Sequence, residues 1–383
     1  MTYSRRVVAA IGLGQLLAWG SSYYLLAIVA RPMAADLQLE PVWVYACFSA
    51  ALLVAAALGP FAGARIDRDG GRRVLLASNF TFAAALLLLA TAQTPYSLLL
   101  GWLVMGAAMS MGLYDAAFST VVALYGTQAR RGIVGVTLIA GFASSVSWPL
   151  TAAIDAYGGW RMACAVWALL HLTVGLGLHL RMVPNVPPTA PLHEHAPATP
   201  TAAVSTRLIW TLAVAFAASG FVFAAMAAHL PRLLQVIGCT PAVAVAAASL
   251  VGVAQVVARF TEAGLLSRVH PMVTARISIC LHPIGALLVG LFGAPLAFVF
   301  AALHGAGMGM MTIVKGALPL ALFGPGGFGR RAGLLEAPAK VAQATAPIVF
   351  GVLLDHLHAG ALWLLLGIAM IGVFSVMSLR LPD

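Results

Sequence analysis

The chain carries very little charge for its length. Asp, Glu, Lys and Arg make up only 8% of its 383 residues, whereas 62% are hydrophobic, and the mean hydropathy is +0.98. One or two soluble cores cannot bury this much apolar surface. The composition therefore excludes a soluble globular protein and predicts a chain embedded in a lipid bilayer.

Cysteine and the common catalytic motifs are also scarce. The four cysteines fall singly inside apolar runs, without a CxxC spacing, which excludes a disulfide framework and a cysteine-based zinc site. GxSxG, HExxH, Walker and GxGxxG arrangements do not occur in a suitable context. We therefore expect no enzyme and no cofactor, and the lack of a nucleotide-binding loop excludes ATP hydrolysis as an energy source.

Twelve segments are long and apolar enough to cross a bilayer, for which about 20 residues are needed. All should be helices, because backbone polar groups must be satisfied within each span. The first is too long for a secretion signal and lacks a clear cleavage site, so we expect it to be retained. The predicted spans are 8–30, 42–63, 74–93, 97–125, 133–155, 162–182, 207–230, 241–263, 273–293, 295–323, 333–354 and 359–380.

The basic residues lie in short groups between these spans, without the interleaved aromatics of a nucleic-acid site, so nucleic acid is not an expected partner. With the N-terminus inside, three arginines fall outside (Arg31, Arg161 and Arg232) and fifteen fall inside. This bias predicts an inner-membrane protein with both termini in the cytoplasm. The fifteen are Arg5, Arg6, Arg65, Arg68, Arg72, Arg73, Arg130, Arg131, Arg181, Arg207, Arg268, Arg276, Arg330, Arg331 and Arg380.

The longest hydrophilic stretch divides the spans six and six. Residues 183–206 contain six prolines and the run His193-Glu194-His195, and we interpret them as a flexible cytoplasmic linker rather than a metal site. The predicted domains are therefore an N-terminal half, 1–182, and a C-terminal half, 207–383.

The two halves repeat each other. A shift of 200 residues places Arg68 on Arg268, Asp155 on Asp355, and Val104–Phe118 on His304–Leu318, which sets Asp115 opposite Lys315. Two parallel six-helix repeats are typical of secondary transporters that bind substrate near the membrane midplane. The fold class is thus all-α and integral to the membrane, with twelve helices in two pseudo-symmetric halves.

The segment between spans 2 and 3 is the densest group of charges in the chain. Its pattern, Gly63-x-x-x-Asp67-Arg68-x-Gly70-x-Arg72-Arg73, closely resembles the corresponding loop of the major facilitator superfamily. That resemblance implies a cytoplasmic gate, in which Glu262 and Arg268 also take part. Gly63 permits close helix approach and Gly70 a tight turn, while Asp67 can pair with arginines or with the positive end of a neighbouring helix. The alternative is an arginine anchor alone.

Within the superfamily, the chain resembles the bacterial monocarboxylate porters and oxalate/formate exchangers. Trp19–Tyr24, Arg31-Pro32 and Pro41–Val44 follow the order of their first two spans. In span 8, Gly252-x-x-Gln255-x-x-x-Arg259 is similar to their Gly-x-x-Asp-x-x-x-Arg, where the arginine engages the carboxylate and the aspartate helps couple protons. Gln255 cannot titrate, which argues against proton coupling through that position.

Ionisable groups inside spans mark the candidate site, because each costs about 2.5–3.5 kcal/mol at a helix centre on insertion scales. Three cations against one deep acid favour an anionic substrate, with Arg259 as a bidentate carboxylate ligand. The predicted substrate-binding residues are Arg259, Lys315, Lys340, Tyr23, Tyr24, Tyr114 and Gln255, and the predicted coupling or ion-pair residues are Asp115 and Glu336. The alternative is structural pairing of Asp115 with Lys315 and of Glu336 with Lys340.

Thioether and imidazole groups form a second pattern. Met105-x-x-x-Met109 in span 4 and His304-x-x-x-Met308 in span 10 are soft ligands of the kind that select Cu(I). Some bacterial copper importers of the superfamily are similar in carrying such pairs in other spans. The alternative is that methionine fills irregular gaps beside glycines.

The sequence as a whole predicts a monomeric secondary transporter of a small organic anion, coupled to protons by symport rather than exchange. Its partners are the anion, the lipid bilayer and the proton. The alternatives are efflux of hydrophobic or drug-like compounds, Cu(I) import, and a transporter-like sensor.

Overall fold

The computed structural model describes residues 4–185 and 206–379, and the predicted linker run His193–His195 lies outside these ranges. The described residues are helical throughout, apart from short turns. The α-helices are α1 (Arg5–Trp19), α2 (Leu25–Asp36), α3 (Pro41–Asp69), α4 (Gly71–Ala90), α5 (Pro95–Gly112), α6 (Tyr114–Tyr125), α7 (Ala129–Ala140), α8 (Ala143–Leu170), α9 (Leu176–Met182), α10 (Thr206–Val236), α11 (Pro241–Gly264), α12 (Pro271–Phe292), α13 (Ala297–Phe323), α14 (Phe328–Leu357) and α15 (Ala361–Met377).

Nine helices in the described residues are long and apolar enough to cross a membrane, or ten if the bent pair Arg5–Tyr24 and Ile28–Asp36 is one span. Two of the nine, Pro95–Ala140 and Phe328–Met377, are 46 and 50 residues long. Each is more than twice the length of about 20 residues that one crossing needs. Each also contains a turn with positive φ, at Gly126 and at His358. Phe328–Met377 thus covers most of two predicted spans, 333–354 and 359–380, whereas Pro95–Ala140 covers 97–125 and only the start of 133–155.

The chain divides into two compact units. Unit 1 comprises Met1–Glu194 and Phe323–Ala337, and unit 2 comprises His195–Leu322 and Pro338–Asp383. The segment Phe323–Ala337, which includes the start of α14, therefore groups with unit 1 although it follows the linker in sequence. The division at 183–206 stays a prediction.

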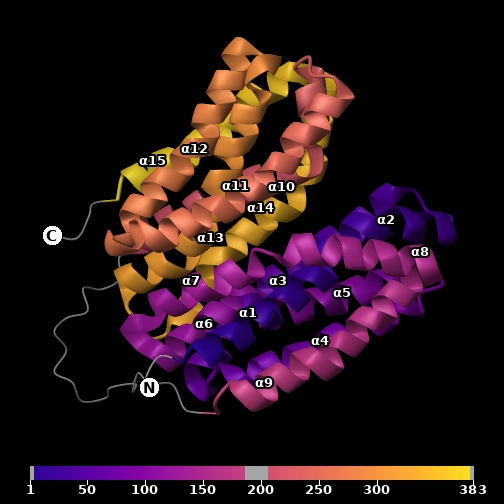
Figure 1. Cartoon of the computed structure of the whole chain (residues 1–383), viewed down its shortest axis with the longest axis vertical. Coiled ribbons are helices and arrows are strands. Elements are labelled where there is room, and N and C mark those ends of the chain that lie inside the picture. Colours follow the sequence, from indigo (N-terminus) through magenta and orange to yellow (C-terminus); the bar gives the residue numbers. More distant parts are fainter. Residues whose placement is uncertain (1–3, 186–205, 380–383) are drawn as a thin grey trace. The chain divides into compact units, whose positions relative to one another are not determined.

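In unit 1, α5 packs against both α3 and α4, and α1 packs against α7 (Figure 1). The largest fully buried side chains there include Trp102, Trp167 and Phe82. In unit 2, α15 packs against α10 and α12, and Phe300 and Phe350 belong to the apolar core.

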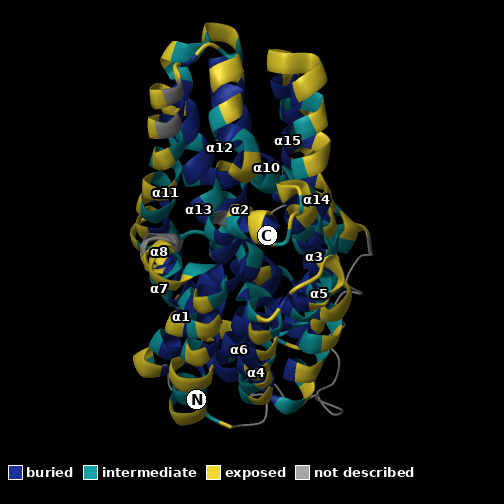
Figure 2. Ribbon diagram, turned by 90° about the vertical axis from the view of Figure 1, so that its right-hand side faces the viewer, coloured by how far each residue is buried: buried dark blue, intermediate teal, exposed yellow. Residues whose placement is uncertain are grey.

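Large apolar side chains also cover the outer faces of the helices. Phe61 is 73% exposed, Phe374 68% and Leu291 62%, and Figure 2 shows exposed residues along outer helix faces and buried ones along inner faces. Large apolar side chains exposed in this number are unfavourable in water, whereas lipid is a favourable environment for them.

Two kinds of structural feature recur in both units, but the predicted shift of 200 residues does not pair their residues, since it sets Gly106 on Ala306 and Asp36 on Val236. A side chain at Gly106 would overlap the carbonyl oxygen of Ala51, and one at Gly305 would overlap that of Val251. Ion pairs also recur near the ends of spans, Asp36 with Arg161 in unit 1 and Asp355 with Arg232 in unit 2. The close crossing of the second and fourth spans is thus present in both halves, because glycine allows backbones to approach.

Candidate functional site

The predicted gate segment contacts the start of α14 within unit 1. The Asp67 carboxylate accepts hydrogen bonds from the backbone N–H groups of Gly329 (2.7 Å) and Arg330 (2.8 Å). These N–H groups lie in the first turn of α14, where no intrahelical acceptor is available. A carboxylate there both satisfies the donors and complements the positive end of the helix dipole. Of the two partners considered for Asp67, the structure therefore shows the helix end.

Gly63 makes this approach possible. A side chain at Gly63 would overlap the carbonyl group of Gly329, and one at Gly333 would come within 2.6 Å of Pro60. Gly59, one turn away on α3, has more room, since a Cβ there would lie 4.0 Å from the Cα of Gly333. We call the contact of Gly63 and Asp67 with Gly329 and Arg330 the α3–α14 contact.

The arginines of this segment bond elsewhere. Arg65 and Arg68 contact Asp69 at 2.5 and 3.1 Å, and Arg72 donates to the carbonyl oxygen of Leu180 at 2.5 Å. Gly70, with φ of 81°, ends α3 and allows the chain to turn into α4. Arg73 and Arg268 are exposed. Arg65 and Arg68 thus share Asp69 as a partner, whereas Arg72 bonds the end of α9.

Sequence reasoning missed the other side of the α3–α14 contact. The run Gly324–Gly329 leads into the first turn of α14 and contains four glycines, and it was a usable signal for a tight turn. Arg331 donates to the carbonyl oxygens of Phe323 (3.1 Å) and Gly324 (3.2 Å) and also bonds Gly326. These bonds satisfy carbonyl groups at the end of α13 and fix the turn that presents Gly329 to Asp67.

The span that carries Asp115 is broken at Leu113. This residue is extended (φ −86°, ψ −172°), so α5 ends at Gly112 and α6 begins at Tyr114, with Asp115 in its first turn. A carboxylate in the first turn of a helix is stabilised by the helix dipole. Half-helix ends of this kind line binding sites in transporters.

Gln15 on α1 holds the break in place. Its Nε2 donates to the carbonyl oxygen of Gly112 at 2.6 Å, and the side chain is 1% exposed. The bond satisfies a carbonyl group next to the break, where helical bonding is interrupted. Gln15 is a lone polar residue in an apolar run, which gives no sign of its role in the sequence.

Replacement of Gln15 by leucine is expected to destabilise the protein by about 1–3 kcal/mol, because the buried Gly112 carbonyl loses its donor. Thermal unfolding of the detergent-purified protein measures the change. Gln128→Leu is the control, since Gln128 is exposed and such substitutions usually change stability by less than about 0.5 kcal/mol. Equal stability of the two variants would show that Gln15 does not hold the break.

The three predicted tyrosines lie together around this break. Trp19 packs against Tyr23 and Tyr114, with ring centroids 4.7 and 5.1 Å apart, and its centroid is 6.4 Å from that of Tyr24. Phe48 contacts Tyr23 edge-on at 5.0 Å. The carboxylates of Asp115 and Glu336 both act electrostatically on Tyr23. Within unit 1, the three tyrosines therefore form one aromatic cluster with Trp19, beside the carboxylates of Asp115 and Glu336.

In unit 2, Arg259 is buried on α11. It is 7% exposed, and its side chain makes a long hydrogen bond of 3.5 Å from Nη2 to Oε1 of Gln255. In the part of the chain that the structure describes, its Nε has no hydrogen-bond partner. A buried cation is costly unless an anion or several acceptors compensate for lost hydration.

The other predicted cations of unit 2 lie on neighbouring helices. The Lys315 ammonium on α13 lies 5.7 Å from the ring centroid of Phe216. Lys340 on α14 is 6% exposed, one turn after the buried Glu336. Glu262 is buried in the last turn of α11.

Helices α11 and α13 cross closely near these groups. Side chains at Gly305 and Gly309 would overlap the carbonyl oxygens of Val251 and Gln255. The crossing sets the Gln255–Arg259 turn of α11 against α13, the helix that carries Lys315.

The soft ligands are divided between the units. Met105 and Met109 are buried in unit 1, whereas His304 and Met308 belong to unit 2. There, the Nδ1 atoms of His304 and His282 are 2.9 Å apart.

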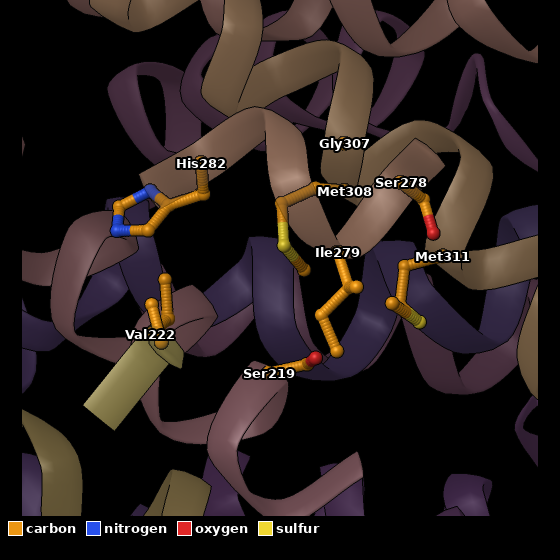
Figure 3. Close-up of a pocket in the computed structure, with 9 residues that line it drawn as sticks. Ser219, Val222, Ser278, Ile279, His282, Gly307, Met308 and Met311 are labelled. Carbon is orange, nitrogen blue, oxygen red and sulfur yellow. The ribbon is translucent and has the colours of Figure 1, made fainter. Parts of the chain in front are cut away.

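Met308 and Met311 line a cavity of about 20 Å³ together with His282 (Figure 3). That volume is enough for about one water molecule, so this cavity is too small for a carboxylate substrate.

Three comparisons with known proteins bear on this arrangement. The family model described as Major Facilitator Superfamily matches residues 11–300, and no curated protein matches the sequence. The solved structure of the human organic anion transporter MFSD10 (TETRAN) is similar at 18% identity and a TM-score of 0.74, covering 97% of this chain and 99% of that one.

Two structures of FucP are similar as well. The first, a superfamily transporter in the outward conformation, has 14% identity, a TM-score of 0.75 and 97% coverage of both chains. The second, a variant of the E. coli fucose:proton symporter, has 15% identity, a TM-score of 0.71 and the same coverage. At these identities the likeness establishes the fold alone.

The chain belongs to the Major Facilitator Superfamily. It is a multi-pass membrane protein and a secondary transporter of small molecules rather than an enzyme.

Proposed function

We propose that this transporter moves a small carboxylate across the inner membrane by alternating access, coupled to protons by symport. The observation that carries the proposal is the buried Arg259 guanidinium, which has no ion pair among the described residues. A carboxylate would accept two parallel hydrogen bonds from it and neutralise its charge. Lys315 and Lys340 add positive charge to the same unit and favour an anion further.

The comparisons are compatible with this substrate class and coupling ion. One similar structure is named as an organic anion transporter and another as a proton symporter. Those properties belong to those proteins, and their bearing on this chain is part of the proposal. The narrower relationship to the bacterial monocarboxylate porters is also part of the proposal, and it rests on the span 8 pattern around Arg259.

The α3–α14 contact supports alternating access. Two charge-assisted hydrogen bonds and one glycine contact are strong enough to hold a conformation and few enough to be broken in a transport cycle. We propose that the contact forms on the cytoplasmic side, where both termini also lie, and that the protein works as a monomer.

A thermal-shift screen tests the substrate class. Detergent-purified protein is heated with lactate, pyruvate, acetate or oxalate, with hydrophobic drugs, and with Cu(I). A ligand that binds only the folded state at about 100 times its Kd stabilises it by about 2.7 kcal/mol.

Stabilisation by a carboxylate that Arg259→Ala removes is the expected result. Stabilisation only by hydrophobic compounds, or only by Cu(I) in a manner lost in Met308→Ala, would contradict it and favour the corresponding alternative. Binding without flux in vesicles would point to a sensor.

A further inference from the structure

Four buried polar side chains of unit 1 form a continuous hydrogen-bonded chain. The Ser21 hydroxyl lies 2.8 Å from Nε2 of His171, whose Nδ1 lies 3.1 Å from Oδ1 of Asn79, and Nδ2 of Asn79 lies 2.8 Å from Nδ1 of His179. Each of the four residues is at most 4% exposed. The proposed substrate and coupling residues do not include any of them.

The chain joins two π-helical turns. Ser21 lies in the turn Gly20–Tyr24, and His171 begins the turn His171–Gly175. Single π-helical turns inside α-helices are frequent at functional sites. Ser21 is two residues from Tyr23, so the network reaches the aromatic cluster beside Asp115.

The direction of the hydrogen bonds follows from one carbonyl group. Nδ2 of Asn79 lies 2.7 Å from the carbonyl oxygen of Leu75, which accepts only, and this fixes the orientation of the amide. The second hydrogen of Nδ2 then points to His179, whose Nδ1 must be an acceptor. Oδ1 of Asn79 accepts in turn from His171, whose Nδ1 therefore carries a hydrogen.

These assignments leave Nε2 of His171 as the variable position. In neutral His171, Nε2 carries no hydrogen and accepts a hydrogen bond from the Ser21 hydroxyl. If Nε2 binds a proton, the Ser21 hydroxyl can rotate toward the carbonyl oxygen of Ala18, 3.4 Å away, and accept from Nε2. That carbonyl also accepts from Ser22 at 2.6 Å, and a carbonyl oxygen has two lone pairs. A proton on Nε2 of His171 can therefore be donated to the Ser21 hydroxyl oxygen, 2.8 Å away.

The surroundings of His171 contain few charges. Phe82 stacks on the imidazole, with centroids 4.6 Å apart and ring planes at 14°, and an aromatic face stabilises a cation. Burial has the largest influence on His171 and disfavours its charged form, and His179 is the one group whose charge acts on it among the described residues. The helices around the turn His171–Gly175 carry other titratable or charged groups. These are Arg5 and Arg6 on α1, Tyr23 and Tyr24 in the turn Gly20–Tyr24, Arg72 and Arg73 on α4, Asp155, Tyr157, Arg161 and Cys164 on α8, and Arg181 on α9.

We propose that Nε2 of His171 is a proton-binding site of this transporter, and that its occupancy sets the direction of the Ser21 hydroxyl. The proton comes from water and is released to water, so no other reactant is needed. The assignment rests on the proposed proton-coupled function, and it supplies a titratable group where Gln255 has none. Because His171 is buried, it exchanges its proton only when the conformation changes, which ties the proton to the transport cycle.

Nitrogen NMR of histidine-labelled protein tests the site directly. Between about pH 8 and pH 5, the range in which histidines can change charge, the His171 imidazole is expected to gain a proton, and its signal is identified as the titrating signal that is missing in His171→Gln. Ser21→Ala should shift the pH midpoint of that signal, because Nε2 loses its hydroxyl donor. A His171 signal that stays neutral down to pH 5 overturns the proposal. If His171→Gln does not fold, the signal whose pH midpoint shifts in Ser21→Ala is taken as that of His171. Whether that signal gains a proton then decides the question in the same way.

Vesicles with an outward or inward pH gradient test the coupling. His171→Gln is expected to lose gradient-driven accumulation of radiolabelled lactate by about tenfold or more, within the roughly 5- to 150-fold range of typical couplings, while lactate counterflow persists. His282→Gln, a buried histidine of unit 2, is the matched control and should keep both activities. Gradient-driven accumulation that is unchanged in His171→Gln rejects a coupling role. If the wild-type protein does not move lactate at all, the carboxylate proposal fails, and the NMR titration still decides whether His171 binds a proton.

Discussion

Replacing Arg259 with alanine is expected to abolish saturable carboxylate uptake without lowering thermal stability. Loss of one member of a buried charged pair costs about 2–5 kcal/mol, so carboxylate binding should weaken by at least about 30-fold. Without substrate, however, the substitution removes a buried cation that no ion pair compensates among the described residues, and this relieves the cost of its lost hydration. Uptake into vesicles and thermal unfolding of the same preparation measure the two effects.

Two further arginine variants sharpen this result. Arg259→Lys keeps the charge but lacks the planar fork, so its affinity should lie between those of wild type and alanine. Arg276 on α12 donates to the carbonyl oxygen of Leu379 at 2.7 Å, and Arg276→Ala should therefore lower stability and preserve uptake. Wild-type uptake by Arg259→Ala would show that the guanidinium does not bind the substrate.

The fold could be predicted from the sequence to a large extent, because lipid imposes simple rules on length and polarity. Each predicted span coincides, over its described residues, with mainly helical structure, since the backbone must satisfy its own hydrogen bonds in a bilayer. The breaks within spans were not predicted. Leu113 carries no proline or glycine signal of its own, and the break depends on Gln15, which is 97 residues away from Gly112 in the chain.

The candidate site could be predicted only in part. Asp67 and Arg259 stand in patterns that indicate their chemistry, but the partner of Asp67 at Gly329 is 262 residues away. Tyr23, Tyr24 and Tyr114 were selected for their hydroxyl groups, and the structure shows in addition that Trp19 brings their rings together. The Ser21 to His179 network was missed because lone polar residues in apolar runs give no local sign of their partners.

The α3–α14 contact gives the second large expected effect, in which Gly63→Ala impairs transport and Gly59→Ala does not. Both substitutions add one methyl group to the same helix, one turn apart. At Gly63 the methyl group would overlap the Gly329 carbonyl, whereas at Gly59 the nearest atom, the Cα of Gly333, would be 4.0 Å away. Overpacking against backbone costs about 1–3 kcal/mol, which corresponds to a change of about 5- to 150-fold in the population that makes the contact.

Asp67→Asn separates the loss of this contact from a simple steric defect. The amide keeps the shape of the carboxylate but has a single acceptor oxygen for the N–H groups of Gly329 and Arg330, and it carries no charge to complement the helix end. If the contact is one state of a gate, Asp67→Asn and Gly63→Ala should both reduce lactate uptake and leave equilibrium binding within a few-fold of wild type. The accessibility of cysteine to a thiol reagent, on the side of the membrane where the α3–α14 contact lies, should rise in both variants and stay at the wild-type level in Gly59→Ala. Equal uptake by all three variants would show that α3 and α14 meet here for stability alone, since a gate cannot lose its closed contact and keep its cycle unchanged.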